Sequence, residues 1–170
     1  MNPTNLLSPW SGPYGGVPPW DRVSPSDFSP ALTAVLAEQS ETIGAIATNP
    51  SPPDFANTIV AIERAGLTKS RVLRMFAVMR LNMSTPEYRA LDAQWQPKLA
   101  AASDAIIFAP GLFERIDAVY RSLPNAALRA DQARLVTLLW DSFVRSGARL
   151  GEADRQRLSA INQELASLYA

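Results

Sequence analysis

Prolines are distributed unevenly along this chain, and their concentration near the N-terminus constrains the fold more than any other feature. Half of the 14 prolines fall within the first thirty residues, namely Pro3, Pro9, Pro13, Pro18, Pro19, Pro25 and Pro30. Proline lacks a backbone N–H and clashes with the preceding turn, so this segment is not a regular helix. The segment also carries large apolar side chains that a solvated linker would not contain: Trp10, Tyr14, Val17, Trp20 and Phe28. Residues 1–26 are therefore predicted to form an extended strap that packs over a helical body.

Helical periodicity follows the strap and continues to the end of the chain. Apolar residues recur three and four positions apart, as in the run Leu32, Val35, Leu36, Ile43 and Ile46, and the chain shows no sustained alternation typical of strands. A length of 170 residues fits one domain with a sizeable core. The sequence predicts an all-α fold of six to seven mostly antiparallel helices over residues 27–170.

Capping residues and helix breakers predict where these helices begin and end. Ser26 or Asp27 is expected to cap the first long helix, and Gly66 is expected to end the second in a left-handed conformation. Pro97 lies inside the fourth helical segment and should kink or divide it. Gly147 is expected to close the sixth helix.

The charge balance and the missing residue types exclude several classes of function. Sixteen basic and sixteen acidic residues give a net charge of zero, so a nucleic-acid or anionic-membrane partner is not expected. Cysteine and histidine are both absent. The chain therefore has no disulfide, no thiol nucleophile and no imidazole to act as a general base or metal ligand. A leader pattern and a membrane-spanning apolar run are also missing, which predicts a soluble, cytoplasmic protein.

Neighbouring carboxylates are the features closest to an acid–base pair. Enzymes separate the pKa values of such pairs, but here each pair falls on or near a polar helix face, where solvated surface charge is the better interpretation. The pairs are Glu38 and Glu41, Glu114 and Asp117, and Glu152 and Asp154. The sequence accordingly predicts no catalytic, cofactor-binding or metal-ligating residue in this chain.

Other candidate features also favour structural roles. The glycine-rich segment 12–16 could offer backbone N–H groups to a phosphate, but it lacks the Lys-Ser/Thr of a P-loop and is interpreted as part of the strap. A basic side on the third helix is interpreted as solvated surface. It consists of Lys69, Arg71, Arg74 and Arg80.

Methionine and tryptophan side chains are the remaining candidates for core or interface positions. Met75, Met79 and Met83 recur at helical spacing, which favours filling of the core over a binding surface. Trp95 and Trp140 either anchor the core or face another domain, and the sequence leaves both possibilities open.

Several motifs, taken in order, resemble the N-terminal region of the M3 family of zinc oligopeptidases. The resemblance spans essentially the whole chain and depends on the order and spacing of the motifs. They are Asn5-Leu6-Leu7, Gly12 to Asp21, Pro53 to Ile59 with Glu63, Leu112 to Ile116, Phe143 to Ala148, and Arg157 to Leu165. Two of the stretches, Phe55 to Glu63 and Leu112 to Val119, resemble the peptidyl-dipeptidase branch, which releases C-terminal dipeptides, more than they resemble oligopeptidase A.

The resemblance implies a role without catalysis for this chain. The family binds zinc through His-Glu-x-x-His and a further Glu, and a chain without histidine does not contain that signature. The resemblance places zinc and the catalytic residues in a C-terminal domain missing from this chain, and gives the N-terminal helices one wall of a channel for short peptides. The last helix, from about Glu152, has no terminating residue, as expected of a chain cut before that domain.

Two alternatives come from other functional classes. A free-standing helical module could use the proline- and aromatic-rich strap and an exposed apolar face to bind a protein partner. An enzyme working with carboxylates alone is disfavoured, because no carboxylate pair stands out from ordinary surface charge.

Overall fold

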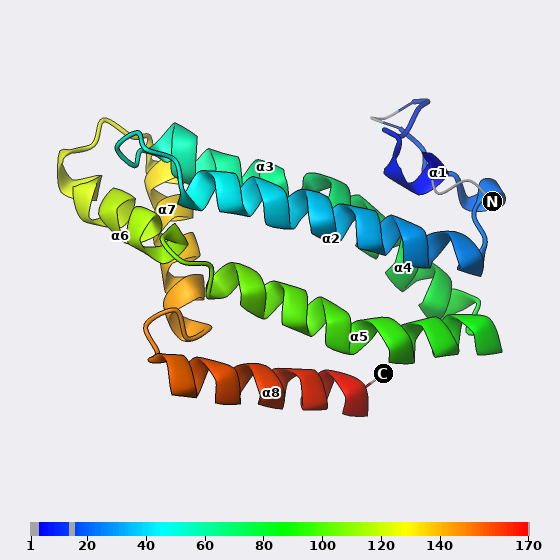
Figure 1. The fold of residues 1–170 in the computed structure, drawn as a ribbon. Helices are drawn as coiled ribbons and strands as arrows, with labels where there is room; N and C mark the ends of the chain where they lie inside the picture. Colours follow the sequence, from blue (N-terminus) through cyan, green and yellow to red (C-terminus); the bar gives the residue numbers. More distant parts are fainter. Residues whose placement is uncertain (1–3, 14–15, 170) are drawn as a thin grey trace.

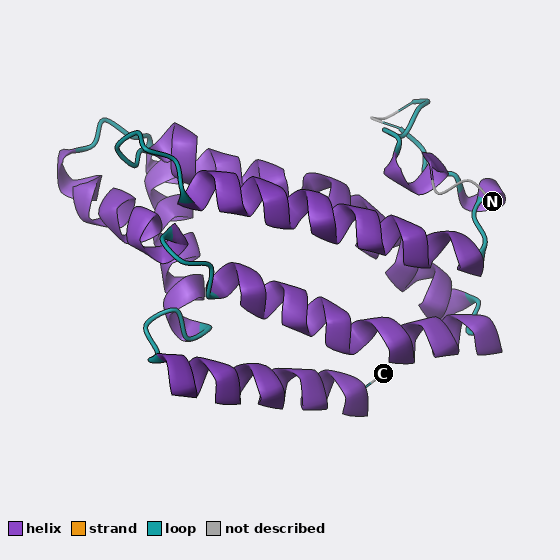
Figure 2. Ribbon diagram, in the orientation of Figure 1, coloured by secondary structure: helices purple, strands orange, loops and turns teal. Residues whose placement is uncertain are grey.

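The computed structural model describes residues 4–13 and 16–169, and their regular structure is helical (Figures 1 and 2). In the described part, strand-like pairing is limited to an isolated bridge between Ser11 and Val17. The α-helices are α1 (Thr4–Leu7), α2 (Pro25–Ala47), α3 (Ala61–Ala65), α4 (Leu67–Asn82), α5 (Pro86–Ile107), α6 (Leu112–Ser122), α7 (Ala130–Arg145) and α8 (Glu152–Leu168). Beside the single turn α1, the described residues form seven α-helices, so the predicted all-α fold is confirmed.

The long helices lie side by side and are capped at one end by a crossing pair. In Figure 1, α2 and α5 run in the same direction, while α4 and α8 run antiparallel to them. Helix α4 packs on α2, and α8 packs on α5 as an outer layer. Helices α6 and α7 contact each other beyond the C-terminal ends of α2 and α5. None of the described helices combines the length and apolar character needed to cross a bilayer.

The N-terminal segment packs on the body as predicted, but it is not extended throughout. It contains the turn α1 and a short 3-10 helix, η1 (Trp20–Arg22). Leu6 is fully buried against α2 and α4, and Trp10 packs against the same cluster. Trp20 and Val17 are exposed, so only some of the strap's large apolar side chains contribute to the core. Tyr14 lies outside the described residues.

The first long helix begins earlier than the sequence predicts, because neither Ser26 nor Asp27 is its N-cap residue. Ser24 is the N-cap residue, and Pro25 occupies the first helical position. The backbone N–H and the hydroxyl of Ser24 both donate to Asp27 Oδ2, at 2.8 Å each. Asp27 is therefore the third residue of the helix, and its carboxylate accepts hydrogen bonds from the N-cap residue Ser24.

The chain from residue 54 to residue 82 is almost continuously helical. A π-helical segment, η2 (Phe55–Val60), leads directly into α3, and its cap Asp54 accepts a hydrogen bond from Asn57 N at 2.6 Å. The predicted left-handed stop at Gly66 is wrong, because its φ of −92° and ψ of −4° are right-handed. Helix α4 therefore starts at the next residue.

Pro97 and Gly147 are the two other residues that the sequence predicts to interrupt or end a helix. Pro97 lies inside α5, which remains one helix, so it does not divide the segment. Gly147 adopts φ +91°, and Ala148 N and Gly147 N donate to the carbonyls of Phe143 and Val144. This pair of hydrogen bonds is the Schellman motif, and it confirms the predicted end of α7 at Gly147.

The interior consists of three apolar clusters arranged along the molecule. The largest joins the strap to α2, α4 and α5, with Leu6, Phe28, Leu32, Met75, Phe76 and Trp95 among its members. A second joins the C-terminal end of α2 to α6 and α7 through Ile43, Ile46, Leu112, Ile116 and Phe143. The smallest joins η2 to α6 and α7 through Ile59, Val119 and Val136.

Candidate functional site

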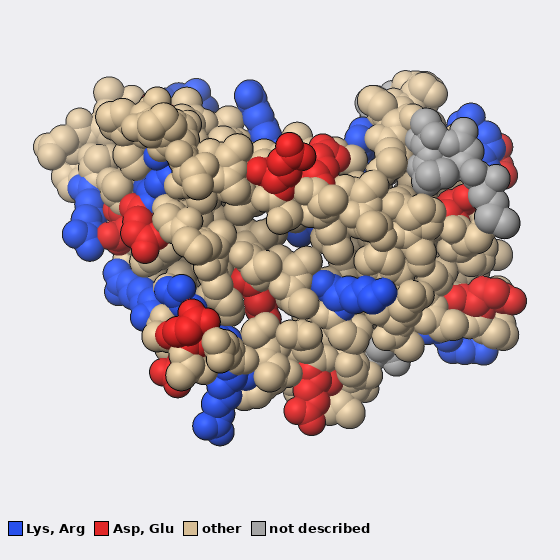
Figure 3. All heavy atoms as spheres, viewed as in Figure 1, with Lys and Arg blue, Asp and Glu red and all other residues tan. Residues whose placement is uncertain are grey.

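The structure brings no metal-binding group together in the part of the chain it describes. Within residues 4–13 and 16–169, no three His, Cys, Asp or Glu side chains are placed to hold a metal ion. The carboxylates of the pairs at 38/41 and 152/154 are exposed on α2 and α8, and Glu114 is exposed on α6. Figure 3 shows acidic and basic side chains interspersed on one face of the molecule. These carboxylates lie at the surface, as the sequence predicts.

Asp117 is the exception among these carboxylates, because it is half-buried and has three side-chain partners: Trp140, Arg121 and, 3.9 Å away, Arg149. Trp140 Nε1 donates to its Oδ1 at 2.8 Å, and Arg121 Nη2 lies 2.7 Å from its Oδ2. The Trp140 ring stacks on Tyr120 with centroids 4.3 Å apart, and Arg149 covers the indole at 4.8 Å. Asp117 thus joins α6 to α7 through Trp140.

Arg115 is the most elaborate polar centre of the fold, and sequence reasoning did not identify it. The side chain is buried on α6. Its Nη1 donates to the carbonyls of Asn49 and Ser51, at 2.7 and 3.0 Å. Its Nη2 donates to Asn57 Oδ1 at 2.9 Å and to Thr58 Oγ1 at 3.3 Å. Two of the motifs that carry the resemblance, Pro53 to Ile59 and Leu112 to Ile116, therefore meet at this guanidinium.

The other motifs of the resemblance also maintain structure. Asn5 Nδ2 donates to the Arg22 carbonyl at 3.1 Å and holds the two ends of the strap together. Arg155 donates to the Ala148 carbonyl at 2.8 Å, just beyond the end of α7. Asn162 donates to Asp104 Oδ1 at 2.9 Å and joins α8 to α5. The motifs that contain Asn5, Ala148 and Asn162 each take part in a hydrogen bond that fixes one segment against another.

The glycine-rich segment and the basic side of α4 do not form an anion site in the described residues. Gly16 N donates to the Pro13 carbonyl and Val17 N to the Ser11 carbonyl, so these N–H groups are used within the strap. Gly16 has φ +110°, and a Cβ there would lie 2.6 Å from the Trp10 carbonyl oxygen. The glycine thus allows the turn to close against Trp10.

The basic residues of α4 serve different local partners. Arg80 forms an ion pair of 2.9 Å with Asp92 of α5, and Arg71 donates to the Leu7 carbonyl of the strap at 3.3 Å. Burial lowers the pKa of Lys69. These contacts attach α4 to its neighbours, so the basic side is more than the solvated surface that the sequence predicts.

The core positions predicted for the methionines and tryptophans are confirmed for some of these residues and not for others. Met75 is buried, Met79 packs on the main cluster and Met83 is exposed, so the core interpretation holds for two of the three. Trp95 is buried and donates from Nε1 to Ser29 Oγ at 2.8 Å, so it anchors the core. Trp140 is half-buried in the α6–α7 contact.

Helix α8 presents its more apolar side to solvent. The exposed large apolar residues of α8 and of its C-cap, here named the α8 outer face, are Ile161, Leu165, Leu168 and Tyr169. Its partly buried residues are mainly small or polar: Arg155, Leu158, Ser159, Asn162, Gln163 and Ala166. A surface helix normally turns its apolar stripe toward the core, so this arrangement is typical of a face that another surface covers.

Comparison with known proteins gives relatives of one kind. No family model matches the chain. The dipeptidyl carboxypeptidase of Salmonella typhimurium is 34% identical over 170 residues, which cover all of this chain and 25% of that protein. The dipeptidyl carboxypeptidase of Escherichia coli is also 34% identical over 170 residues, covering 99% of this chain and 24% of that protein. The chain thus spans about a quarter of the length of the curated relatives it matches.

Identity at this level along the whole chain agrees with the resemblance in the motifs. The matched region includes the residues around Arg115, the strap and the end of α7. The chain is therefore homologous, over its whole length, to a portion of dipeptidyl carboxypeptidase, which is an M3 peptidase.

Proposed function

We propose that this chain is the non-catalytic helical domain of a zinc-dependent M3 peptidase, in which it shapes one wall of the channel that admits short peptides. The observation that carries the proposal is the 34% identity over the whole chain to about a quarter of dipeptidyl carboxypeptidase. The parent reaction would be the release of C-terminal dipeptides, in keeping with the name of those relatives.

The chain's own residues do not fit zinc. They lack histidine, and the described part offers no group of three acidic side chains that could replace it. We therefore assign the metal and the reacting groups of the proposed peptidase to a portion that this sequence does not include. The contribution of the chain is steric: it packs on that portion and limits what enters the channel.

The α8 outer face supports the expected partner, which is the catalytic portion of the same peptidase. Leu168 and Tyr169 are 73% and 85% exposed, an unusual position for two large apolar side chains next to each other. Homologues about four times as long carry additional chain that could cover such a face. We propose that the catalytic portion packs there.

The intact mass of the native protein tests this function directly. An antibody against these 170 residues would capture the protein from its source for mass spectrometry and for assay with a blocked tripeptide. We expect a mass of about four times 18.5 kDa and zinc-dependent dipeptide release. A mass near 18.5 kDa without dipeptide release would overturn the proposal and leave the free-standing interaction module.

A further inference from the structure

Helix α8 differs from the other long helices in having no part in the apolar interior. None of its described residues is buried, whereas α2, α4, α5, α6 and α7 each contain buried residues. No described α8 residue belongs to any of the three apolar clusters. Because burial of apolar surface is the main source of stability, α8 is held less firmly than the other long helices.

The contact between α8 and α5 is close, but it is made by small and polar side chains. Helix α8 lies along α5, with residues such as Ser159, Asn162 and Ala166 on its partly buried side. Within the described part of the chain, one side-chain hydrogen bond joins the two helices, from Asn162 to Asp104 Oδ1 at 2.9 Å. Asp104 Oδ2 is buried there without a partner, which is costly. Small side chains let the helices lie near each other while burying little apolar area.

The contact is also incompletely filled near the beginning of α8. A groove of about 430 Å³ opens between α5, the end of α7 and α8. Its walls include Asp104, Arg145, Leu158 and Asn162. Side chains that line an open space lack partner atoms on one side and lose the dispersion attraction of close packing. This end of α8 therefore adds little to the attachment.

The connection between α7 and α8, residues 146–151, offers a hinge at its last residue. Arg149 lies over the Trp140 ring at 4.8 Å, which holds the middle of the connection on the body. Gly151 follows as the N-cap residue of α8. A Cβ built on Gly151 would have no atom within 4 Å, so no close neighbour restrains this position. Glycine adopts a wide range of backbone angles, so α8 can turn about this residue.

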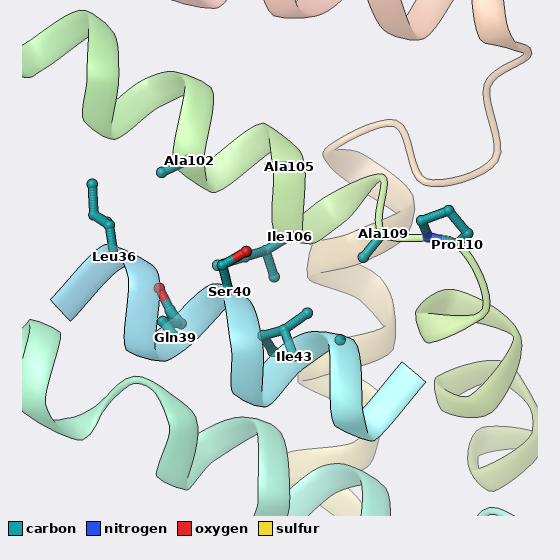
Figure 4. A pocket seen from close by; sticks show the side chains of 10 residues that line it. Leu36, Gln39, Ser40, Ile43, Ala102, Ala105, Ile106, Ala109 and Pro110 are labelled. Atoms are coloured by element: carbon teal, nitrogen blue, oxygen red, sulfur yellow. The ribbon is translucent and has the colours of Figure 1, made fainter. Parts of the chain in front are cut away.

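Helix α5 is attached to the body independently of α8. Tyr88 and Trp95 are buried in the main apolar cluster, which α5 shares with α2 and α4. Figure 4 shows side chains of α2 and α5 on the two sides of a cavity of about 270 Å³, with Ala102 and Ala105 on the α5 side. The departure of α8 therefore leaves α5 packed on α2.

We propose that α8 is a movable arm, which leaves α5 as one unit by turning about Gly151 while α2 to α7 stay folded. Opening the arm breaks the hydrogen bond between Asn162 and Asp104 and the contact between small side chains. A surface that binds the α8 outer face thus moves α8 relative to α5 without unfolding the body. The arm is a property of the 170-residue chain and does not depend on the proposed peptidase role.

Hydrogen exchange of the dilute, monomeric 170-residue chain, measured by mass spectrometry, tests the arm. A helix of 17 residues has little stability without tertiary packing, so the α8 amides exchange once α8 has left α5. We expect the most protected α8 amides to exchange on the order of 100-fold faster than the most protected α2 amides. Equal protection of the two helices would overturn the proposal, because α8 would then open only when the whole chain unfolds.

A variant in the body separates opening of the arm from global unfolding. Ile59 is fully buried in the smallest apolar cluster, to which α8 does not contribute. The contacts of Ile59 persist when the arm opens and are lost when the chain unfolds. We therefore expect Ile59→Val to speed exchange of the most protected α2 amides by about 2- to 10-fold and to leave α8 exchange unchanged. The same acceleration in both helices would contradict a separate arm.

A variant in the arm tests the contact that opening breaks. Asn162→Ala removes the hydrogen bond to Asp104, so α8 exchange should become about 2- to 10-fold faster. Gln156→Ala, on the exposed side of α8, is the matched control and should change α8 exchange by less than about 2-fold. Equal α8 exchange in the Asn162→Ala variant and the wild type would rule out this contact as the one that holds the arm.

Discussion

Arg115 is a buried guanidinium whose hydrogen bonds all end on neutral oxygen atoms. Replacing it by methionine keeps the bulk of the side chain and removes four donor contacts. Charge-assisted hydrogen bonds contribute more than neutral ones, and two backbone carbonyls would lose their donor. We expect Arg115→Met to lower the free energy of unfolding by about 3 kcal/mol or more, as measured by urea denaturation.

A matched control for this variant is Arg121→Met on the same helix. The Arg121 side chain is 75% exposed, so its end of the ion pair with Asp117 lies in solvent. Exposed pairs contribute about 0–1 kcal/mol, so this variant should remain close to the wild type. Equal losses for the two variants would show that the Arg115 contacts carry no special weight.

The phenol of the single residue Tyr88 makes the stability of the native protein depend on pH. Burial, followed by the negative charge of Asp27, raises the pKa of its phenol above the ordinary value of 10.0. Above pH 10 the unfolded chain loses this proton while the native protein retains it, so native stability falls as pH rises toward the native pKa. We expect Tyr88→Phe to flatten this fall in denaturation curves measured between pH 9 and 11. Identical slopes in the two proteins would rule out Tyr88 as the titrating group.

Gly147 determines where α7 ends, and its substitution tests that helix terminus. A Cβ at this φ of +91° would lie 2.8 Å from Leu150 Cδ1 and 2.9 Å from Leu158 Cδ2. We expect Gly147→Ala to lower the free energy of unfolding by about 1–2 kcal/mol in urea denaturation. Gly44→Ala, inside α2 with open space around it, should instead raise it by about 0.5–1 kcal/mol. A neutral Gly147→Ala would mean that the turn rearranges at no cost.

The two glycines at predicted helix ends show which element boundaries a sequence can specify. Gly147 precedes a segment that leaves the helix, and its left-handed conformation ends α7 where the sequence predicts. Gly66 remains right-handed, because glycine adopts either hand and residue type alone does not choose between them. At the start of α2, three capping residues compete, and the position of Pro25 selects Ser24.

At the scale of the whole molecule, the fold class could be predicted, but the polar centre could not. Helical periodicity is a local property, so the number and type of helices follow from sequence. The acceptors of Arg115 lie 57 to 66 residues away along the chain. Half of them are backbone carbonyls, which every residue has, so residue type does not indicate which carbonyl accepts. The signal that could have identified them was the family resemblance, since both segments belong to its motifs.

The α8 outer face is the feature that connects the fold to the proposed peptidase. If another surface covers it in the parent protein, the 170-residue chain alone should self-associate through it. We expect sedimentation velocity to show concentration-dependent association, and Leu165→Lys to suppress it while changing stability by less than about 0.5 kcal/mol, because Leu165 is 44% exposed. Leu81→Lys, at an exposed site on α4, should leave association unchanged. A wild-type chain that stays monomeric at all concentrations, or a Leu81→Lys variant with the same effect, would contradict the role given to α8.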